Sequence, residues 1–149
     1  MYARIYRAPY YYMQKFNFLH TVVIPAYNVC RGIIMKISVC LIVKNEESVI
    51  GRCLKSVILF ADEIIVVDTG SGDKTKEIAS KFTDKIYDFK WNDDFSAARN
   101  YAFSKASCNY LFWIDADDVI SEENAKKIIE IKNNKACFDT YMFRYAIAF

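Results

Sequence analysis

Short apolar runs and helical stripes of apolar residues alternate along this chain. Residues 37–43 form a nearly continuous apolar, β-branched run, which is typical of a strand buried on both faces of a parallel sheet. Apolar positions then recur at helical spacing from Val49 to Ile58, and Asn45 is a candidate cap for that helix. Further strands are predicted at 63–68, 85–89, 110–114 and 140–149, and further helices at 74–82, 95–106 and after Ser121. This alternation predicts an α/β fold with a mostly parallel sheet flanked by helices.

The first 34 residues differ in composition from the rest. They hold both prolines, are rich in Tyr and Phe, and contain no Asp or Glu. The regular pattern begins at Met35, although residues 21–28 also resemble an opening strand. We interpret residues 1–34 as an atypical, loosely packed N-terminal extension and residues 35–149 as the domain itself.

Composition and charge exclude several classes of protein. A chain of 149 residues with 54% hydrophobic and 26% charged residues is typical of one globular domain. The net charge of +2, without a cluster of Lys and Arg, argues against a nucleic-acid partner. The five cysteines include no CxxC pair, so they indicate buried thiols in a reducing compartment rather than disulfides or zinc ligands. His20 is the single histidine, which leaves little for a His-based triad.

The sequence contains no segment typical of membrane insertion or secretion. No apolar run reaches the roughly 20 residues of a membrane span. The N-terminus also lacks the apolar stretch of a signal peptide. We therefore predict a cytoplasmic location and leave peripheral membrane contact open.

Three polar clusters each follow a predicted strand. Asp68 opens a glycine-rich turn, where a carboxylate can accept hydrogen bonds from a base or a ribose. Asp115, Asp117 and Asp118 crowd three carboxylates that repel one another unless a cation such as Mg²⁺ or Mn²⁺ offsets them. Arg99, near the start of a predicted helix, is suited to pair with a phosphate. Because ligands bind at the carboxyl ends of strands in open α/β sheets, we expect the clusters to face one crevice.

Each cluster taken alone has other interpretations. A plain turn, an acidic surface loop and a surface arginine would need no ligand. A dinucleotide fingerprint is disfavoured because the third glycine is missing and the turn follows the second strand of the domain. A phosphatase of the haloacid-dehalogenase kind usually carries its acids on the first strand, unlike Asp115 and Asp117.

In their order along the chain, the motifs resemble those of the family 2 glycosyltransferases. In that family a first strand ends in Asn-Glu or Tyr-Asn, and a glycine turn with an Asp follows. An Ala-Arg-Asn helix and a hydrophobic strand that enters Asp-Ala-Asp-Asp come next. This sequence carries the corresponding segments at 43–47, 67–73, 98–100 and 113–118. Thr69 stands where many relatives have a second Asp, which shifts contacts to the nucleotide but leaves Asp68 in place.

The resemblance implies a GT-A-like fold, incomplete at its C-terminus, that binds a nucleotide-sugar donor, with a UDP-sugar favoured. The family transfers the sugar with inversion to an acceptor hydroxyl of a saccharide, lipid or protein, assisted by Mg²⁺ or Mn²⁺. By resemblance, Asp117 binds the metal, and the general base lies beyond Phe149. The implied nucleotide-sugar ligands are Asn45, Glu46, Asp68, Arg99 and Asp115. The alternative is a truncated, non-catalytic module that binds the nucleotide sugar without transferring it.

Overall fold

The fold is built on one six-stranded sheet. The computed structural model describes residues 2–7, 34–134 and 140–144. The strands lie in the order β4-β3-β2-β5-β1-β6. Their bounds are β1 Tyr2–Arg7, β2 Ile37–Val43, β3 Glu63–Asp68, β4 Ile86–Asp88, β5 Tyr110–Trp113 and β6 Thr140–Arg144. Strands β4, β3, β2 and β5 run parallel, whereas β1 pairs antiparallel with both β5 and β6. The predicted α/β fold with a mostly parallel sheet is thus confirmed.

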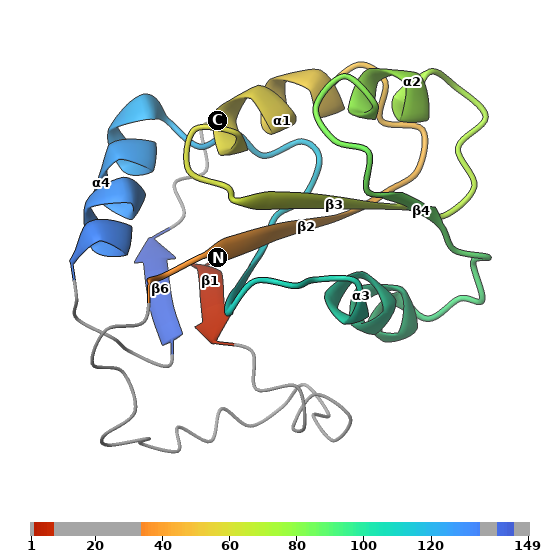
Figure 1. Ribbon diagram of the computed structural model, residues 1–149. Coiled ribbons are helices and arrows are strands. Elements are labelled where there is room, and N and C mark those ends of the chain that lie inside the picture. Colours follow the sequence, from red (N-terminus) through yellow and green to blue (C-terminus); the bar gives the residue numbers. More distant parts are fainter. Residues whose placement is uncertain (1, 8–33, 135–139, 145–149) are drawn as a thin grey trace.

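Helices cover both faces of the parallel strands. Helices α1 (Ile50–Val57) and α2 (Thr75–Ala79) lie on one face, and α3 (Phe95–Ser104) lies on the other (Figure 1). Helix α4 (Glu122–Asn133) is capped by Ser121, as the sequence predicts. The side chain of Ser121 accepts a hydrogen bond from the backbone N–H of Asn124. Each crossover from one parallel strand to the next therefore carries a helix, as this topology requires.

The core has two layers because β2 sends alternate side chains to opposite faces. Val39 and Leu41 pack in the layer that contains residues of α1, α2 and α4, whereas Cys40 packs with Ala102 of α3. Every residue of β3 is buried, which explains the apolar run at its centre, residues 64–67. Phe60 and Phe112 meet edge to face with ring centroids 5.5 Å apart. These layers hold the parallel strands rigidly and so fix the edge from which the polar loops emerge.

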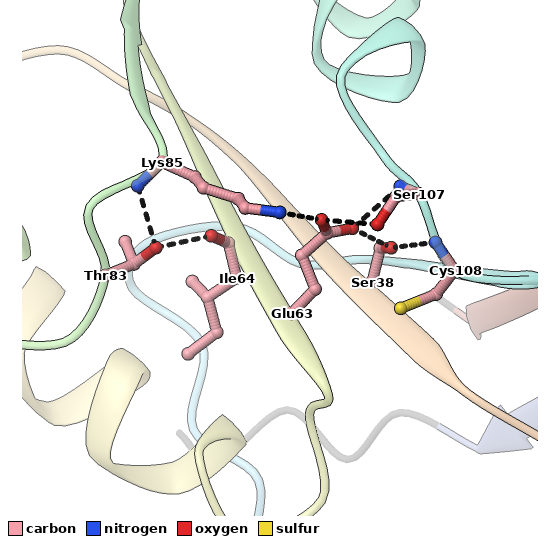
Figure 2. Close-up of polar contacts among 7 residues, drawn as sticks. All are labelled: Ser38, Glu63, Ile64, Thr83, Lys85, Ser107 and Cys108. Carbon is pink, nitrogen blue, oxygen red and sulfur yellow. Dashed lines mark hydrogen bonds and ion pairs between the residues drawn. The ribbon is translucent and has the colours of Figure 1, made fainter.

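Glu63 ties together the amino ends of the strands, away from the polar loops. Its carboxylate accepts hydrogen bonds from the hydroxyl of Ser38 and from the backbone N–H and hydroxyl of Ser107, and it pairs with the ammonium of Lys85 (Figure 2). Burial raises the pKa of Glu63, but these contacts outweigh that effect and lower the pKa to about 2. The carboxylate therefore stays ionised and links β2, β3 and the segments before β4 and β5.

Several sequence expectations differ from the structure. The predicted cap at Asn45 was wrong, since α1 begins at Ile50 after an N-cap at Val49 that makes no side-chain hydrogen bond. The expectation that residues 1–34 are loosely packed was wrong for residues 2–7, which form β1 and pair with β5 and β6 within the sheet. The domain boundary at residue 35 stays a prediction. The second strand signal at residues 21–28 lies outside the described residues. Among the described helices, none is long and apolar enough to cross a bilayer.

The cysteines that the structure describes agree with the sequence interpretation. Cys40, Cys53 and Cys108 are free thiols, and the first two are buried. Cys30 and Cys137 lie outside the described residues.

Candidate functional site

The carboxyl ends of β3, β2 and β5 lie side by side at one edge of the sheet. In the strand register Val43 at the end of β2 is opposite Asp68, and Cys40 is opposite Trp113. Asp68 is therefore the last residue of β3, on one side of β2, and Asp115 lies just beyond the end of β5, on the other side. Two of the three predicted clusters thus emerge on either side of β2 from adjacent strands.

Two loops at this edge are joined by reciprocal hydrogen bonds between the β2–α1 and β3–α2 connections. Asn45 adopts a left-handed backbone conformation with φ of 56°. Its side-chain oxygen accepts the N–H of Gly72 at 2.8 Å, and its own N–H donates to the hydroxyl of Ser71 at 2.9 Å. The N–H of Glu46 donates to the hydroxyl of Thr75 at 2.7 Å. Asn45 therefore shapes the glycine turn, while the predicted nucleotide contacts of Asn45 and Glu46 stay predictions.

Asp68 is buried, and its two carboxylate oxygens have different surroundings. It is 1% exposed. Its Oδ1 accepts the N–H groups of Gly70 and Ser71, both at 2.8 Å. Its Oδ2 has no hydrogen-bond partner in the described part of the chain. A buried carboxylate oxygen without a donor is costly, so this atom is a strong acceptor for a ligand N–H or O–H.

Arg99 reaches the same edge from the face of the sheet that α3 covers. Helix α3 begins after Asp94, whose side chain accepts the N–H groups of Ser96 and Ala97. The guanidinium carbon of Arg99 lies 3.8 Å from the ring centroid of Trp113 at the end of β5. Arg99 also favours the ionised form of Asp115, although desolvation raises the pKa of Asp115 overall. The structure thus brings Arg99 and Asp115 together, as expected for two members of one site.

The acidic loop after β5 is tied to α1. Asp115 and Asp117 accept hydrogen bonds through their backbone oxygens from the thiol of Cys53 and the guanidinium of Arg52, both at 3.4 Å. The N–H of Ile120 donates to the hydroxyl of Ser56 at 3.0 Å. Asp115 and Asp117 themselves are exposed residues of this loop.

The loop carries a concentrated negative charge. Desolvation raises the pKa of Asp115, and the charge of Asp117 raises it further, against the lowering effect of Arg99. Desolvation likewise raises the pKa of Asp118, with further contributions from Asp115 and Asp117. Burial raises the pKa of Cys53 to about 12, and the three aspartates add to that shift. A cation bound here would relieve this repulsion.

The donor set suits a magnesium or manganese ion shared with a ligand. Within the described residues, no three His, Cys, Asp or Glu side chains converge to hold a metal by themselves. Mg²⁺ commonly takes one or two carboxylates and completes its coordination with substrate phosphates and water. Asp115 and Asp117 supply hard oxygen atoms of that kind, so the residues present fit such a shared ion.

The sequence analysis missed residues that shape the site. Trp113 contacts Arg99, and Arg52 contacts the backbone of Asp117. An aromatic residue in a strand and an arginine on a helix are both common, so neither stands out in the sequence. A Trp next to the acidic motif was the one available signal. The contact of Arg52 joins residues 65 positions apart, so only the fold reveals it.

Comparison with known proteins places this geometry in a family. Residues 38–146 match the model described as glycosyl transferase family 2. A TPR repeat-containing protein of Synechococcus elongatus is 45% identical over 83 residues, which are 56% of this chain and 21% of that protein. The SPbeta prophage-derived glycosyltransferase SunS of Bacillus subtilis is 42% identical over 93 residues, which are 61% of this chain and 22% of SunS. The chain thus spans about a fifth of the length of these relatives.

A solved structure agrees with the fold. The crystal structure of S. aureus TarS 1-349 in complex with UDP matches with a TM-score of 0.57 and 28% identity, over 66% of this chain and 32% of that chain. The parallel sheet and its flanking helices therefore have the GT-A glycosyltransferase architecture.

Proposed function

Since this chain belongs to the family 2 glycosyltransferases, we propose that it binds a UDP-sugar at the carboxyl edge of β3, β2 and β5. The reaction we propose for it is transfer of the sugar to an acceptor hydroxyl with inversion at the anomeric carbon. UDP is favoured as the nucleotide because the similar TarS structure is a complex with UDP.

The unused Oδ2 of Asp68 carries this proposal. The atom is buried at the end of a strand, and two backbone N–H groups hold the other carboxylate oxygen in a fixed direction. Its orientation is thus set before a ligand arrives, which lowers the entropic cost of binding. The N3–H of uracil or a ribose hydroxyl provides the donor that Oδ2 lacks in the described residues. A carboxylate acceptor makes a charge-assisted hydrogen bond, which is stronger than one between neutral groups.

We assign the diphosphate end of the donor to Arg99, Asp115 and Asp117. Arg99 offers a planar set of donors that matches phosphate oxygens. Asp117 and Asp115 would hold the divalent cation that the family uses. When bound, that cation supplies Lewis-acid stabilisation of the negative charge on the departing diphosphate. Desolvation and Asp117 raise the pKa of Asp115, whereas Arg99 favours its ionised form, which supports a site in which both signs of charge serve one anionic ligand.

In the proposed transfer, the acceptor oxygen forms a bond to the anomeric carbon from the face opposite the diphosphate. The bond from that carbon to the diphosphate oxygen breaks, and the diphosphate keeps the electron pair. The acceptor hydroxyl proton passes to a general base. No described residue is assigned that role, so the contribution we give this chain is donor binding and stabilisation of the leaving group.

Calorimetric titration tests the donor assignment. We expect UDP to bind the chain more tightly than GDP or dTDP, and more tightly with Mn²⁺ than with EDTA. Equal affinity with and without Mn²⁺ would assign the acidic loop to the fold rather than to a metal. No binding of UDP under either condition would overturn the proposal.

A second measurement separates binding from transfer. Release of UDP from UDP-glucose and UDP-N-acetylglucosamine, with and without simple saccharide acceptors, reports catalysis. Tight UDP binding without any turnover would favour the alternative of a donor-binding module that does not transfer sugar.

A further inference from the structure

Trp113 and Arg99 form the closest described cation–aromatic contact at the candidate site. The guanidinium carbon lies 3.8 Å from the ring centroid, which is stacking distance. Trp113 is the last residue of β5, and it shares a face with Leu111, which packs against Ala102 of α3. The stack therefore joins the end of a core strand to the helix that crosses it.

The stack places the guanidinium next to the acidic loop. Asp115 comes two residues after Trp113, beyond the end of β5. Because its guanidinium is stacked on Trp113, Arg99 lies where β5 passes into the acidic loop.

Trp113 contributes its ring face rather than its N–H group. The indole nitrogen is buried and has no hydrogen-bond partner in the described part of the chain. A buried N–H without an acceptor is unfavourable, so hydrogen bonding does not explain a tryptophan at this position. Tryptophan does offer the largest and most electron-rich surface for a guanidinium.

A free arginine side chain has many rotamers, and ordering them on ligand binding weakens the affinity. We propose that Trp113 is a positioning residue whose ring fixes the Arg99 guanidinium at the end of β5, so that Arg99 is oriented for the donor diphosphate before the donor binds. This inference rests on the proposed function, in which Arg99 pairs with the diphosphate. It adds a residue whose effect on affinity passes through Arg99.

A double-mutant cycle tests this dependence. UDP with Mn²⁺ is titrated into the unaltered chain, Trp113→Leu, Arg99→Ala and the double variant. We expect Trp113→Leu to weaken UDP binding about five- to tenfold. In the Arg99→Ala background the same change should alter affinity by less than about twofold, because the residue it acts through is gone. Equal losses in both backgrounds, or no loss in either, would overturn the proposal.

Conservative and control variants separate positioning from packing. Trp113→Phe keeps an aromatic face and should restore UDP affinity to within about twofold to threefold of the unaltered chain. Tyr87→Leu removes another cation–aromatic contact, in which the ammonium of Lys105 lies 5.2 Å from the ring, and should leave UDP affinity unchanged. If Trp113→Leu does not fold, Trp113→Met takes its place in the cycle. Failure of the phenylalanine variant to recover affinity would contradict a role for the ring face.

A measurement without ligand keeps this inference distinct from the proposed function. In the unliganded chain, the side-chain N–H resonance of Arg99 should be shifted by the Trp113 ring current and protected from exchange with water. Trp113→Leu should remove both effects. If UDP does not bind the unaltered chain but these effects are present, the proposed function fails and the positioning survives. An averaged, freely exchanging resonance in the unaltered chain would overturn the positioning itself.

Discussion

Asp68→Asn should separate binding from stability, because the two carboxylate oxygens have different surroundings. Oδ1 accepts two backbone N–H groups of the glycine turn, and the asparagine carbonyl can keep both hydrogen bonds. The amide NH₂ then takes the place of Oδ2, which has no described partner. The substitution thus replaces an acceptor that faces the proposed ligand by a donor.

The stability of the variant should not fall. A buried ionised carboxylate carries a desolvation penalty of several kcal/mol, which its two backbone donors offset only in part. An amide with unpaired N–H groups costs about 1–3 kcal/mol. We therefore expect Asp68→Asn to leave the free energy of unfolding unchanged or to raise it by about 1 kcal/mol, a rise of roughly 2–4 °C in Tm for a domain of this size.

The affinity should fall instead. A hydrogen bond to a charged acceptor contributes about 1.5–3 kcal/mol, which corresponds to roughly 10- to 100-fold in Kd. The matched control is Asp88→Asn, since Asp88 ends β4 opposite Asp68 but is exposed and paired with Lys76. It should change UDP affinity by less than about twofold.

Calorimetry with UDP and Mn²⁺, together with thermal unfolding followed by circular dichroism, measures both quantities. If Asp68→Asn binds UDP as tightly as the unaltered chain, the free oxygen does not contact the donor. If the variant loses more than about 1 kcal/mol of stability, the fold requires the carboxylate and the reasoning from its unpaired oxygen is wrong.

Three further perturbations have defined outcomes. Glu63→Gln should cost about 3 kcal/mol at pH 7, because the folded pKa of Glu63 is lowered from its ordinary value of 4.5 to about 2. That stabilisation is present above pH 4.5 and is lost as the pH falls toward 2, so urea unfolding should show the variant and the unaltered chain converging over that window. Asp117→Asn should remove most of the Mn²⁺ dependence of UDP affinity in calorimetry. The control Glu123→Gln, on the exposed face of α4, should keep that dependence. Equal Mn²⁺ dependence in both variants would contradict the metal assignment. Asp94→Ala should destabilise the chain by about 1 kcal/mol through loss of the α3 cap, seen as a lower urea midpoint with an unchanged slope.

The parallel half of the fold was predictable because its central strands, β2 and β3, are buried on both faces. Residues 37–43 and 63–68 are confirmed as β2 and β3 with the predicted bounds, since a continuous apolar run permits few other structures. Helix α2 and strand β4 are shorter than predicted, because both lie toward the edge of the sheet, where burial constrains the chain less. Strand β1 was missed because its partners β5 and β6 lie about a hundred residues or more along the chain, and local pattern carries no signal for such pairing.

The sequence predicted the residue types of the candidate site. It did not predict which of these residues hold the loops together and which remain available to a ligand. Asp68, Arg99 and Asp115 stand out in sequence because their chemistry is unusual next to apolar strands. Asn45 was expected to cap a helix, yet its side chain accepts the N–H of Gly72, 27 positions away, while its contact with the nucleotide stays a prediction. Local sequence cannot distinguish an amide that binds a ligand from one that binds a distant backbone, because both need the same atoms. The proposed donor site therefore combines two sets of polar residues, one offered to the ligand and one that holds the loops, and the fold decides which residue belongs to which set.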